Sequence, residues 1–120
     1  MLNNRELGKL GEYFANKYIS QNGYLPLEKN YRTKGGEIDI IAKDGDYTVF
    51  IEVKARKSIR FGYPREAVDY RKQIKIKNIA NIYLSKNNKF NSHIRFDVIE
   101  VMLNTINEVK SITLLKNAFQ

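Results

Sequence analysis

The chain has 120 residues, of which 42% are hydrophobic and 28% are charged, a composition typical of one globular domain. Lys and Arg together number 21 against 13 for Asp and Glu, so the net charge is +8 and favours a polyanionic partner, nucleic acid before an anionic membrane. The absence of cysteine and the single histidine, His93, exclude disulfide scaffolds, zinc fingers, iron–sulfur sites and multi-histidine metal sites.

The first predicted element is a helix from Asn3 to about Gln21. Asn3 and Glu6 have the spacing of a capping box, and apolar residues recur at helical intervals along one face. Residues 24–32 follow as an irregular strand, which Pro26 marks as an edge or bent strand.

A hairpin comes next in the sequence. Residues 37–42 and 47–54 are rich in Ile, Val, Phe and Tyr, and the residues between them include Asp44-Gly45, a strong turn signal. The remaining predicted elements are a helix that starts near Asp69 and two strands, spanning about 69–84, 93–102 and 111–115. The order α-β-β-β-α-β-β indicates an α/β fold with a sheet built around the hairpin and two helices.

Charged residues lie among the apolar residues of this hairpin: Asp39 on its first strand, and Glu52 and Lys54 on its second. One register of the hairpin places Asp39 opposite Phe50 and the other places it opposite Glu52. Both registers put the two carboxylates on one face, with Cβ atoms about 5–8 Å apart. Like charges that close need a cation, a shared proton or a lysine to compensate. Two carboxylates that hold a hard divalent ion beside a lysine form a hydrolytic site.

Each of these residues also has an ordinary structural interpretation. The Glu-Val-Lys pattern by itself fits any half-exposed strand. Asp39 is less easily explained by solvation, because it lies between Ile38 and Ile40.

Asp39, the hairpin and Glu52-Val53-Lys54 resemble the signature of the PD-(D/E)XK nucleases, an Asp followed by Glu-x-Lys on the next strand. The resemblance implies a restriction-endonuclease-like α/β fold, an αβββαβ core with a central mixed sheet flanked by helices. Within that superfamily the chain resembles the YraN-like proteins, a small bacterial endonuclease-like family, over nearly its whole length. The segments that carry this closer resemblance are residues 11–12, 30–32, 36–42, 50–56 and 95–98.

The resemblance implies a role for each matching residue. Asp39 and Glu52 would be ligands of Mg²⁺ or Mn²⁺, with the main-chain carbonyl of Val53 as a third ligand, and Lys54 would be the catalytic lysine. Glu12 matches a first-helix glutamate of the archaeal Holliday-junction resolvases, and its ordinary alternative is a solvated helix glutamate. The resolvase analogy also implies a homodimer, because one site cuts one strand.

Basic and polar residues after the second hairpin strand are candidates for phosphate contacts. They are Arg56, Arg60 and Arg65 at and beyond the end of that strand, and Lys72 and Gln73 in the first turn of the second predicted helix. A solvated charged loop is the alternative interpretation of the three arginines.

The sequence therefore predicts a metal-dependent DNA endonuclease that hydrolyses phosphodiester bonds. A nucleic-acid-binding accessory protein with a weak or partner-dependent nuclease site is one alternative, and a basic surface-binding module is another. No apolar run reaches the roughly 18 residues of a membrane span, and residues 1–14 lack the apolar core of a signal peptide. We expect a cytoplasmic protein without membrane association, folded as one domain over residues 1–120.

Overall fold

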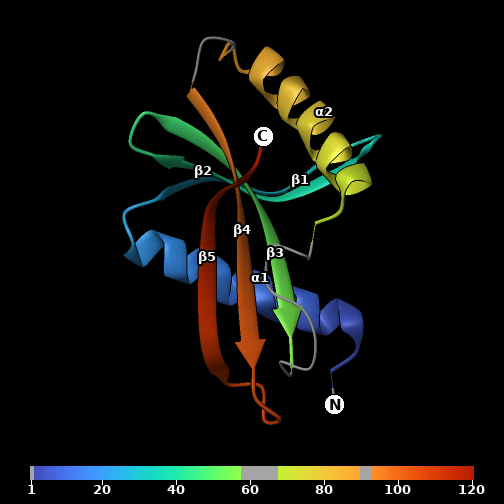
Figure 1. Cartoon of the computed structure of the whole chain (residues 1–120), viewed down its shortest axis with the longest axis vertical. Coiled ribbons are helices and arrows are strands. Elements are labelled where there is room, and N and C mark those ends of the chain that lie inside the picture. The colour runs from blue at the N-terminus through green and yellow to red at the C-terminus, as the bar shows by residue number, and fades with distance from the viewer. Residues whose placement is uncertain (1, 58–67, 90–92) are drawn as a thin grey trace.

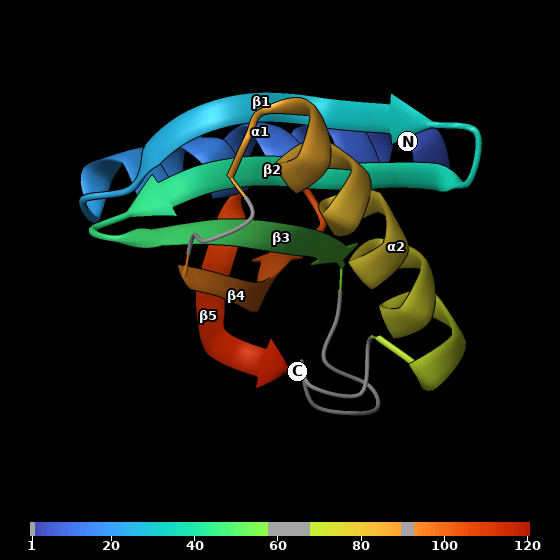
Figure 2. The ribbon, with the colours of Figure 1, turned by 90° about the horizontal axis from the view of Figure 1, so that it is seen from above.

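A computed structural model describes residues 2–57, 68–89 and 93–120. In these ranges a five-stranded sheet has one helix packed on each face (Figure 1 and Figure 2). The elements are α1 (Asn4–Gln21), β1 (Leu25–Thr33), β2 (Gly36–Asp44), β3 (Tyr47–Arg56), α2 (Tyr70–Lys86), β4 (His93–Leu103) and β5 (Val109–Phe119). The predicted element order and the restriction-endonuclease-like α/β fold are confirmed. Neither helix is long and apolar enough to cross a membrane.

The five strands lie in the sheet in their chain order, β1-β2-β3-β4-β5. β3 and β4 are parallel, and the other neighbouring pairs are antiparallel. A parallel pair needs a long crossover connection, and α2 lies in the segment that provides it. β1 and β5 are the edges, and β1 has the predicted irregularity, a register shift between Pro26 and Glu28.

Both helices begin at the residues that the sequence predicts. The Asn3 side chain accepts a hydrogen bond from the main-chain N–H of Glu6 at 2.8 Å, and the Glu6 carboxylate accepts one from the main-chain N–H of Asn3 at 3.0 Å. Asp69 caps α2 by accepting a hydrogen bond from the main-chain N–H of Lys72 at 2.9 Å. The last strand extends well beyond the predicted residues 111–115, because pairing with β4 also recruits polar residues at both of its ends.

Of the two hairpin registers, the one that opposes Asp39 to Glu52 is observed. Asp44 pairs with Tyr47 across the two-residue turn Gly45-Asp46, where Gly45 has a φ of +58°. The regular pairing of β2 with β3 ends at Ile40 opposite Ile51, one residue before the two carboxylates would face each other.

The sheet buries two hydrophobic clusters, one under each helix. The cluster under α2 includes Ile38, Phe50 and Phe96 of the sheet with Ile76 and Ile79 of the helix. The cluster under α1 includes Ile40, Ile51 and Ile99 of the sheet with Ala15 and Ile19 of the helix.

β2 changes the face that it presents to these clusters at Asp39. Ile38 belongs to the cluster under α2, whereas Ile40 belongs to the cluster under α1. Regular alternation would have placed both side chains on one face. The neighbouring strand is also irregular here, because Asn30, which lies opposite Asp39 in β1, has a φ of +51°.

A second polar cluster ties the β2–β3 turn to β4. The Arg95 guanidinium donates hydrogen bonds to Asp44 at 2.7 Å, to the Tyr24 hydroxyl at 2.8 Å and to both Asp97 oxygens at 2.9 and 3.0 Å. Asp97 is fully buried and also accepts hydrogen bonds from the Tyr24 hydroxyl and from the main-chain N–H of Asn117. Because these polar groups satisfy one another's hydrogen-bonding capacity, we assign this cluster a structural role.

At Gly11, α1 closely approaches β3. A Cβ atom at residue 11 would lie 2.6 Å from the Cβ of Ala55, a separation that real Cβ atoms essentially never show. The missing side chain therefore lets α1 lie directly on the sheet, which places the next residue, Glu12, near β2 and β3.

We expect Gly11→Ala to destabilise the protein by about 1–3 kcal/mol, because the added methyl group overpacks the contact with Ala55. The melting temperature should fall by several degrees. Gly8→Ala is the matched control, since a Cβ there meets nothing within 4 Å. That substitution should be neutral or stabilising by up to about 1 kcal/mol through helix propensity. Equal effects at the two positions would contradict the close approach at Gly11.

Candidate active site

Asp39 lies where β2 and β3 separate. Its Oδ2 atom accepts a hydrogen bond from the main-chain N–H of Val53 at 2.8 Å. Since regular pairing has ended at Ile40 and Ile51, the carboxylate supplies the partner that main-chain pairing no longer provides. The Asp39 side chain also interacts with the carboxyl group of Glu52. The structure therefore brings these two sequence-predicted residues together.

Glu52 is the more deeply buried of the pair, with an exposed fraction of 4%. The ammonium of Lys72, from the first turn of α2, lies 2.6 Å from its Oε2 atom. This contact is a close ion pair, and within the described residues Oε2 accepts no well-directed hydrogen bond. The buried oxygen is therefore neutralised without being fully coordinated.

The site shifts the pKa values of Asp39 and Lys72. Burial raises the pKa of Asp39 to about 9, and the hydrogen bond and negative charge of Glu52 add to that rise. The N–H of Val53 opposes the rise only in part. Burial lowers the pKa of Lys72, but its interaction with Glu52 outweighs that effect, so the net pKa is raised. Both shifts favour the protonated forms, a neutral Asp39 and a charged Lys72, as expected of a site with excess negative charge.

Glu12 approaches the pair from α1. It lines a cavity of about 230 Å³ that Asp39 and Asn30 also line. Burial raises the pKa of Glu12, the Asn30 side chain opposes this through a hydrogen bond, and the charges of Glu37 and Glu52 reinforce it. The structure therefore brings Glu12 to the Asp39 side of the site.

Lys54 and Arg56 follow Glu52 at alternate positions of β3. Lys54 is half-buried and forms no ion pair with any residue in the described ranges. The Nε atom of Arg56 lies 3.1 Å from a carboxylate oxygen of Glu100, whose side chain is 8% exposed. Arg56 thus neutralises a buried acid of β4.

The other predicted phosphate contacts have different surroundings. Lys72 reaches the carboxylate pair, whereas the Gln73 amide donates a hydrogen bond to the main-chain carbonyl of Val68 at 3.1 Å. Arg60 and Arg65 lie outside the described residues.

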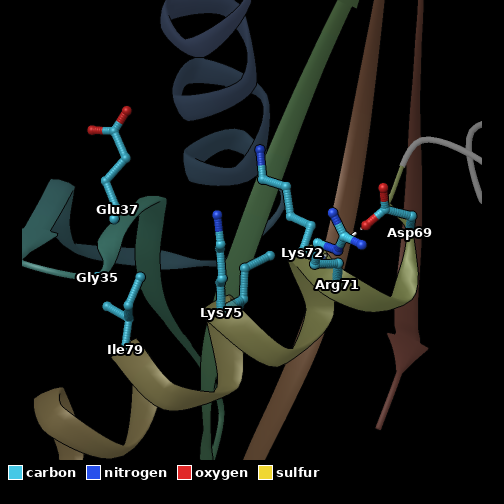
Figure 3. Close-up of a pocket in the computed structure, with 9 residues that line it drawn as sticks. Gly35, Glu37, Asp69, Arg71, Lys72, Lys75 and Ile79 are labelled. Atoms are coloured by element: carbon cyan, nitrogen blue, oxygen red, sulfur yellow. Dashed lines mark hydrogen bonds between the residues drawn. The ribbon is translucent and has the colours of Figure 1, made fainter.

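A groove of about 380 Å³ lies beside the site, between the β1–β2 turn and the first turns of α2 (Figure 3). Lys72 and Lys75 extend from α2 on the same side, with Glu37 across from them (Figure 3). The groove is lined by Gly35, Gly36, Glu37, Asp69, Arg71, Lys72, Lys75, Ile76 and Ile79. Its cationic side chains thus adjoin the carboxylate pair.

The donor atoms at the pair are all oxygens. They belong to the carboxylates of Asp39 and Glu52, and carboxylate oxygens suit Mg²⁺ or Mn²⁺ rather than a soft metal. No group of three or more His, Asp or Glu side chains in the described ranges is arranged to hold a metal. Mg²⁺ is commonly bound through only one or two carboxylates with water in its remaining positions. The poorly coordinated Oε2 of Glu52 also fits such an ion.

Two contacts at the site were not predicted from the sequence: that of Asn30 with Glu12 and that of Lys72 with Glu52. Asn30 lies opposite Asp39 and hydrogen-bonds to Glu12. The only sequence signal for this position is that Asn tolerates a positive φ. Lys72 was placed near the site from its position in the first turn of the helix, but its pairing with Glu52 depends on how α2 packs on the sheet.

Comparison with known proteins identifies the family of this chain. The family model described as "Uncharacterised protein family UPF0102" matches residues 11–101. The chain belongs to the UPF0102 family. This is the YraN family, so the resemblance stated from the sequence motifs is confirmed. The matched region contains every residue of the carboxylate pair and its surroundings, from Glu12 to Lys75.

The similar relatives match along nearly their whole length. A UPF0102 protein of Clostridium kluyveri is 53% identical over 117 residues, covering 98% of this chain and 96% of the relative. A UPF0102 protein of Clostridium botulinum, strain Kyoto, is 54% identical over 120 residues with the same coverage. The family is uncharacterised, so membership by itself assigns no reaction.

We expect Asp39→Asn to stabilise the metal-free protein increasingly as the pH rises. The folded state keeps a proton on Asp39 that the unfolded chain loses above a pH of about 4. Wild-type stability therefore falls as the pH rises from about 4 toward 9. Asn mimics the protonated side chain, so the variant should gain about 1 kcal/mol or more at pH 8, roughly 4 °C.

The measurement is the difference in melting temperature between variant and wild type, recorded from pH 4 to pH 9 in a chelator. Asp46→Asn, at an exposed position of the β2–β3 turn, is the control and should give a difference that does not change with pH. A constant offset for Asp39→Asn would show that burial does not raise its pKa.

Proposed function

We propose that this UPF0102 protein is a divalent-metal-dependent endonuclease that hydrolyses phosphodiester bonds of DNA. The observation that carries the proposal is the interaction between the buried carboxylates of Asp39 and Glu52, with the Lys72 ammonium against Glu52 and Lys54 two residues further along the same strand. Two carboxylates in a sheet interior are costly for stability, and neither the core nor a surface salt bridge requires them there. The basic character of the chain, with a net charge of +8, supports a polyanionic substrate.

The chain's own residues would divide the work at the scissile phosphate. Asp39, Glu52 and the Val53 carbonyl would hold Mg²⁺ or Mn²⁺, and Glu12 would contribute from the Asp39 side. When bound, the ion would supply Lewis-acid polarisation of a phosphate oxygen and a bound water of lowered pKa. Lys54, which has no ion-pair partner in the described ranges, would orient the attacking water and stabilise negative charge as it develops.

The reaction is a hydrolysis with a simple balance. The water oxygen forms a bond to phosphorus, the bond from phosphorus to the 3′ oxygen breaks, and that oxygen takes up a proton. The products carry a 5′-phosphate and a 3′-hydroxyl. This polarity follows from the resemblance to the PD-(D/E)XK nucleases.

We expect Mn²⁺ to raise the melting temperature of the wild-type protein in proportion to the logarithm of its concentration above the dissociation constant. A hundredfold excess over that constant should add about 2.7 kcal/mol of stability. Asp39→Asn and Glu52→Gln should each remove most of this response, because each removes one anionic ligand. Asp46→Asn should keep it. A full Mn²⁺ response in both site variants would place the metal elsewhere.

We expect Lys54→Ala to lower the single-turnover rate of DNA cleavage about 100-fold, the scale of losing one electrostatic contact in a transition state. Its Mn²⁺ response and its affinity for DNA should stay close to those of the wild type. Lys86→Ala, at the far end of α2, is the control and should cleave at the wild-type rate.

Two results would argue against these roles. If Lys54→Ala loses its Mn²⁺ response or its fold first, Lys54 is a structural partner of Glu52. If the wild type cleaves neither duplex, single-stranded nor branched DNA in Mn²⁺, the enzyme proposal fails. The nucleic-acid-binding accessory protein then becomes the better description.

A further inference from the structure

Lys72 belongs both to the carboxylate pair and to the groove beside it. Its ammonium lies 2.6 Å from Oε2 of Glu52, and its side chain lines the groove with Arg71 and Lys75 (Figure 3). The two ends of the ion pair differ in their freedom. The Glu52 side chain is 4% exposed, whereas that of Lys72 is 46% exposed. Only the lysine can therefore leave the contact without disturbing the core.

The Lys72 ammonium lies where a metal ion bound to Glu52 would have to lie. The oxygen it neutralises belongs to Glu52, one of the two carboxylates in the proposed metal set. An ammonium and a divalent cation at the same oxygen would repel each other strongly in a site of low dielectric. Lys72 must therefore withdraw from Glu52 for a divalent ion to bind there.

The helix fixes where the withdrawn side chain can go. The main-chain N–H of Lys72 is held by the Asp69 cap at 2.9 Å, so the start of its side chain stays in the first turn of α2. The long flexible stem can then swing toward the solvent side, into the groove that Lys72 already lines together with Arg71 and Lys75.

The charge of the groove changes with this movement. Its lining has three cationic side chains, Arg71, Lys72 and Lys75, and two acids, Glu37 and Asp69, of which Asp69 is occupied as the helix cap. While Lys72 is paired with Glu52, its charge is already compensated. Once displaced, it adds one uncompensated positive charge to the groove. A phosphodiester, with one negative charge per phosphate, is the matching ligand.

We propose that Lys72 couples divalent-ion binding to nucleic-acid binding, by neutralising Glu52 in the ion-free protein and binding a backbone phosphate in the groove once an ion displaces it. This inference rests on the proposed function and adds a thermodynamic link between its two ligands. Because such coupling is reciprocal, the ion must raise the affinity for nucleic acid by the factor by which nucleic acid raises the affinity for the ion.

The coupling is measured with a fluorescein-labelled DNA, tested as duplex and as single strand. Its dissociation constant is determined in Mn²⁺ and in chelator at equal ionic strength, with each Mn²⁺ reading completed before a gel of a parallel sample detects cleavage. Mn²⁺ should tighten binding about fivefold or more for the wild type and for Lys75→Met. Lys72→Met should lose that increase, and Lys72→Arg should keep part of it. Equal coupling in the wild type and in Lys72→Met would overturn the inference.

A second measurement needs no variant. Amine-reactive esters modify a neutral, accessible lysine, and mass spectrometry gives the rate at each position. Mn²⁺ should speed modification of Lys72 several-fold, and DNA should then slow it, with Lys75 as the internal reference. If Mn²⁺ raises the melting temperature but leaves the Lys72 rate unchanged, the ion does not displace Lys72 and the inference is wrong.

Failure of this inference is distinguishable from failure of the proposed function. Cleavage of DNA with coupling that Lys72→Met does not alter would contradict the inference and leave the nuclease proposal in place. Coupling that depends on Lys72 without any cleavage would support the inference and contradict the nuclease proposal. A wild type that binds no Mn²⁺ would contradict both.

Discussion

Two carboxylates in contact within a sheet interior are the constraint on which this structure depends. An uncompensated buried carboxylate costs several kcal/mol, and a second one beside it raises that cost. The fold meets it with local means. The Val53 N–H donates a hydrogen bond to Asp39, the Lys72 ammonium lies against Glu52, and the raised pKa of Asp39 favours its neutral form beside Glu52. The end of regular pairing between β2 and β3 leaves the Val53 N–H available to Asp39, and the packing of α2 brings Lys72 to Glu52.

The polar cluster around Arg95 shows what a purely structural solution looks like in the same protein. Its buried carboxylate, Asp97, accepts hydrogen bonds from a guanidinium, a hydroxyl and a main-chain N–H. Glu52 is almost as deeply buried, yet within the described residues its Oε2 atom has the half-exposed Lys72 ammonium beside it and no directed hydrogen bond. The contrast distinguishes a fully hydrogen-bonded carboxylate from one that keeps an unsatisfied oxygen.

Much of the fold followed from short-range signals. The capping box at Asn3, the Asp69 cap and the glycine-containing turn between β2 and β3 each fix one element end through local hydrogen bonds or backbone preference, and each was predictable for that reason. The sequence also placed Asp39 and Glu52 on one face but left two registers open, because the turn could centre on either of two residue pairs.

The rest depends on contacts between distant parts of the chain. The reversal of β2 at Asp39 coincides with the irregular backbone of Asn30 on another strand, which no alternation rule within β2 can reveal. The pairing of Arg56 with Glu100 and of Lys72 with Glu52 depends on how β4 and α2 dock. The sequence does not distinguish a basic residue that contacts phosphate from one that forms a structural ion pair, because both occur in polar, basic segments.

The topology also bears on when the site can form during synthesis. Every proposed catalytic group lies within the first 72 residues, but β3 pairs with β4 along its full length, from Tyr47 opposite His93 to Arg56 opposite Met102. A nascent chain that ends before residue 93 therefore carries the whole set of reactive side chains without the strand that buries Glu52 on one side. Most of β4 must leave the ribosome before this burial of Glu52 can form, so the candidate site can be completed only after a strand that follows all of its proposed catalytic residues in the chain.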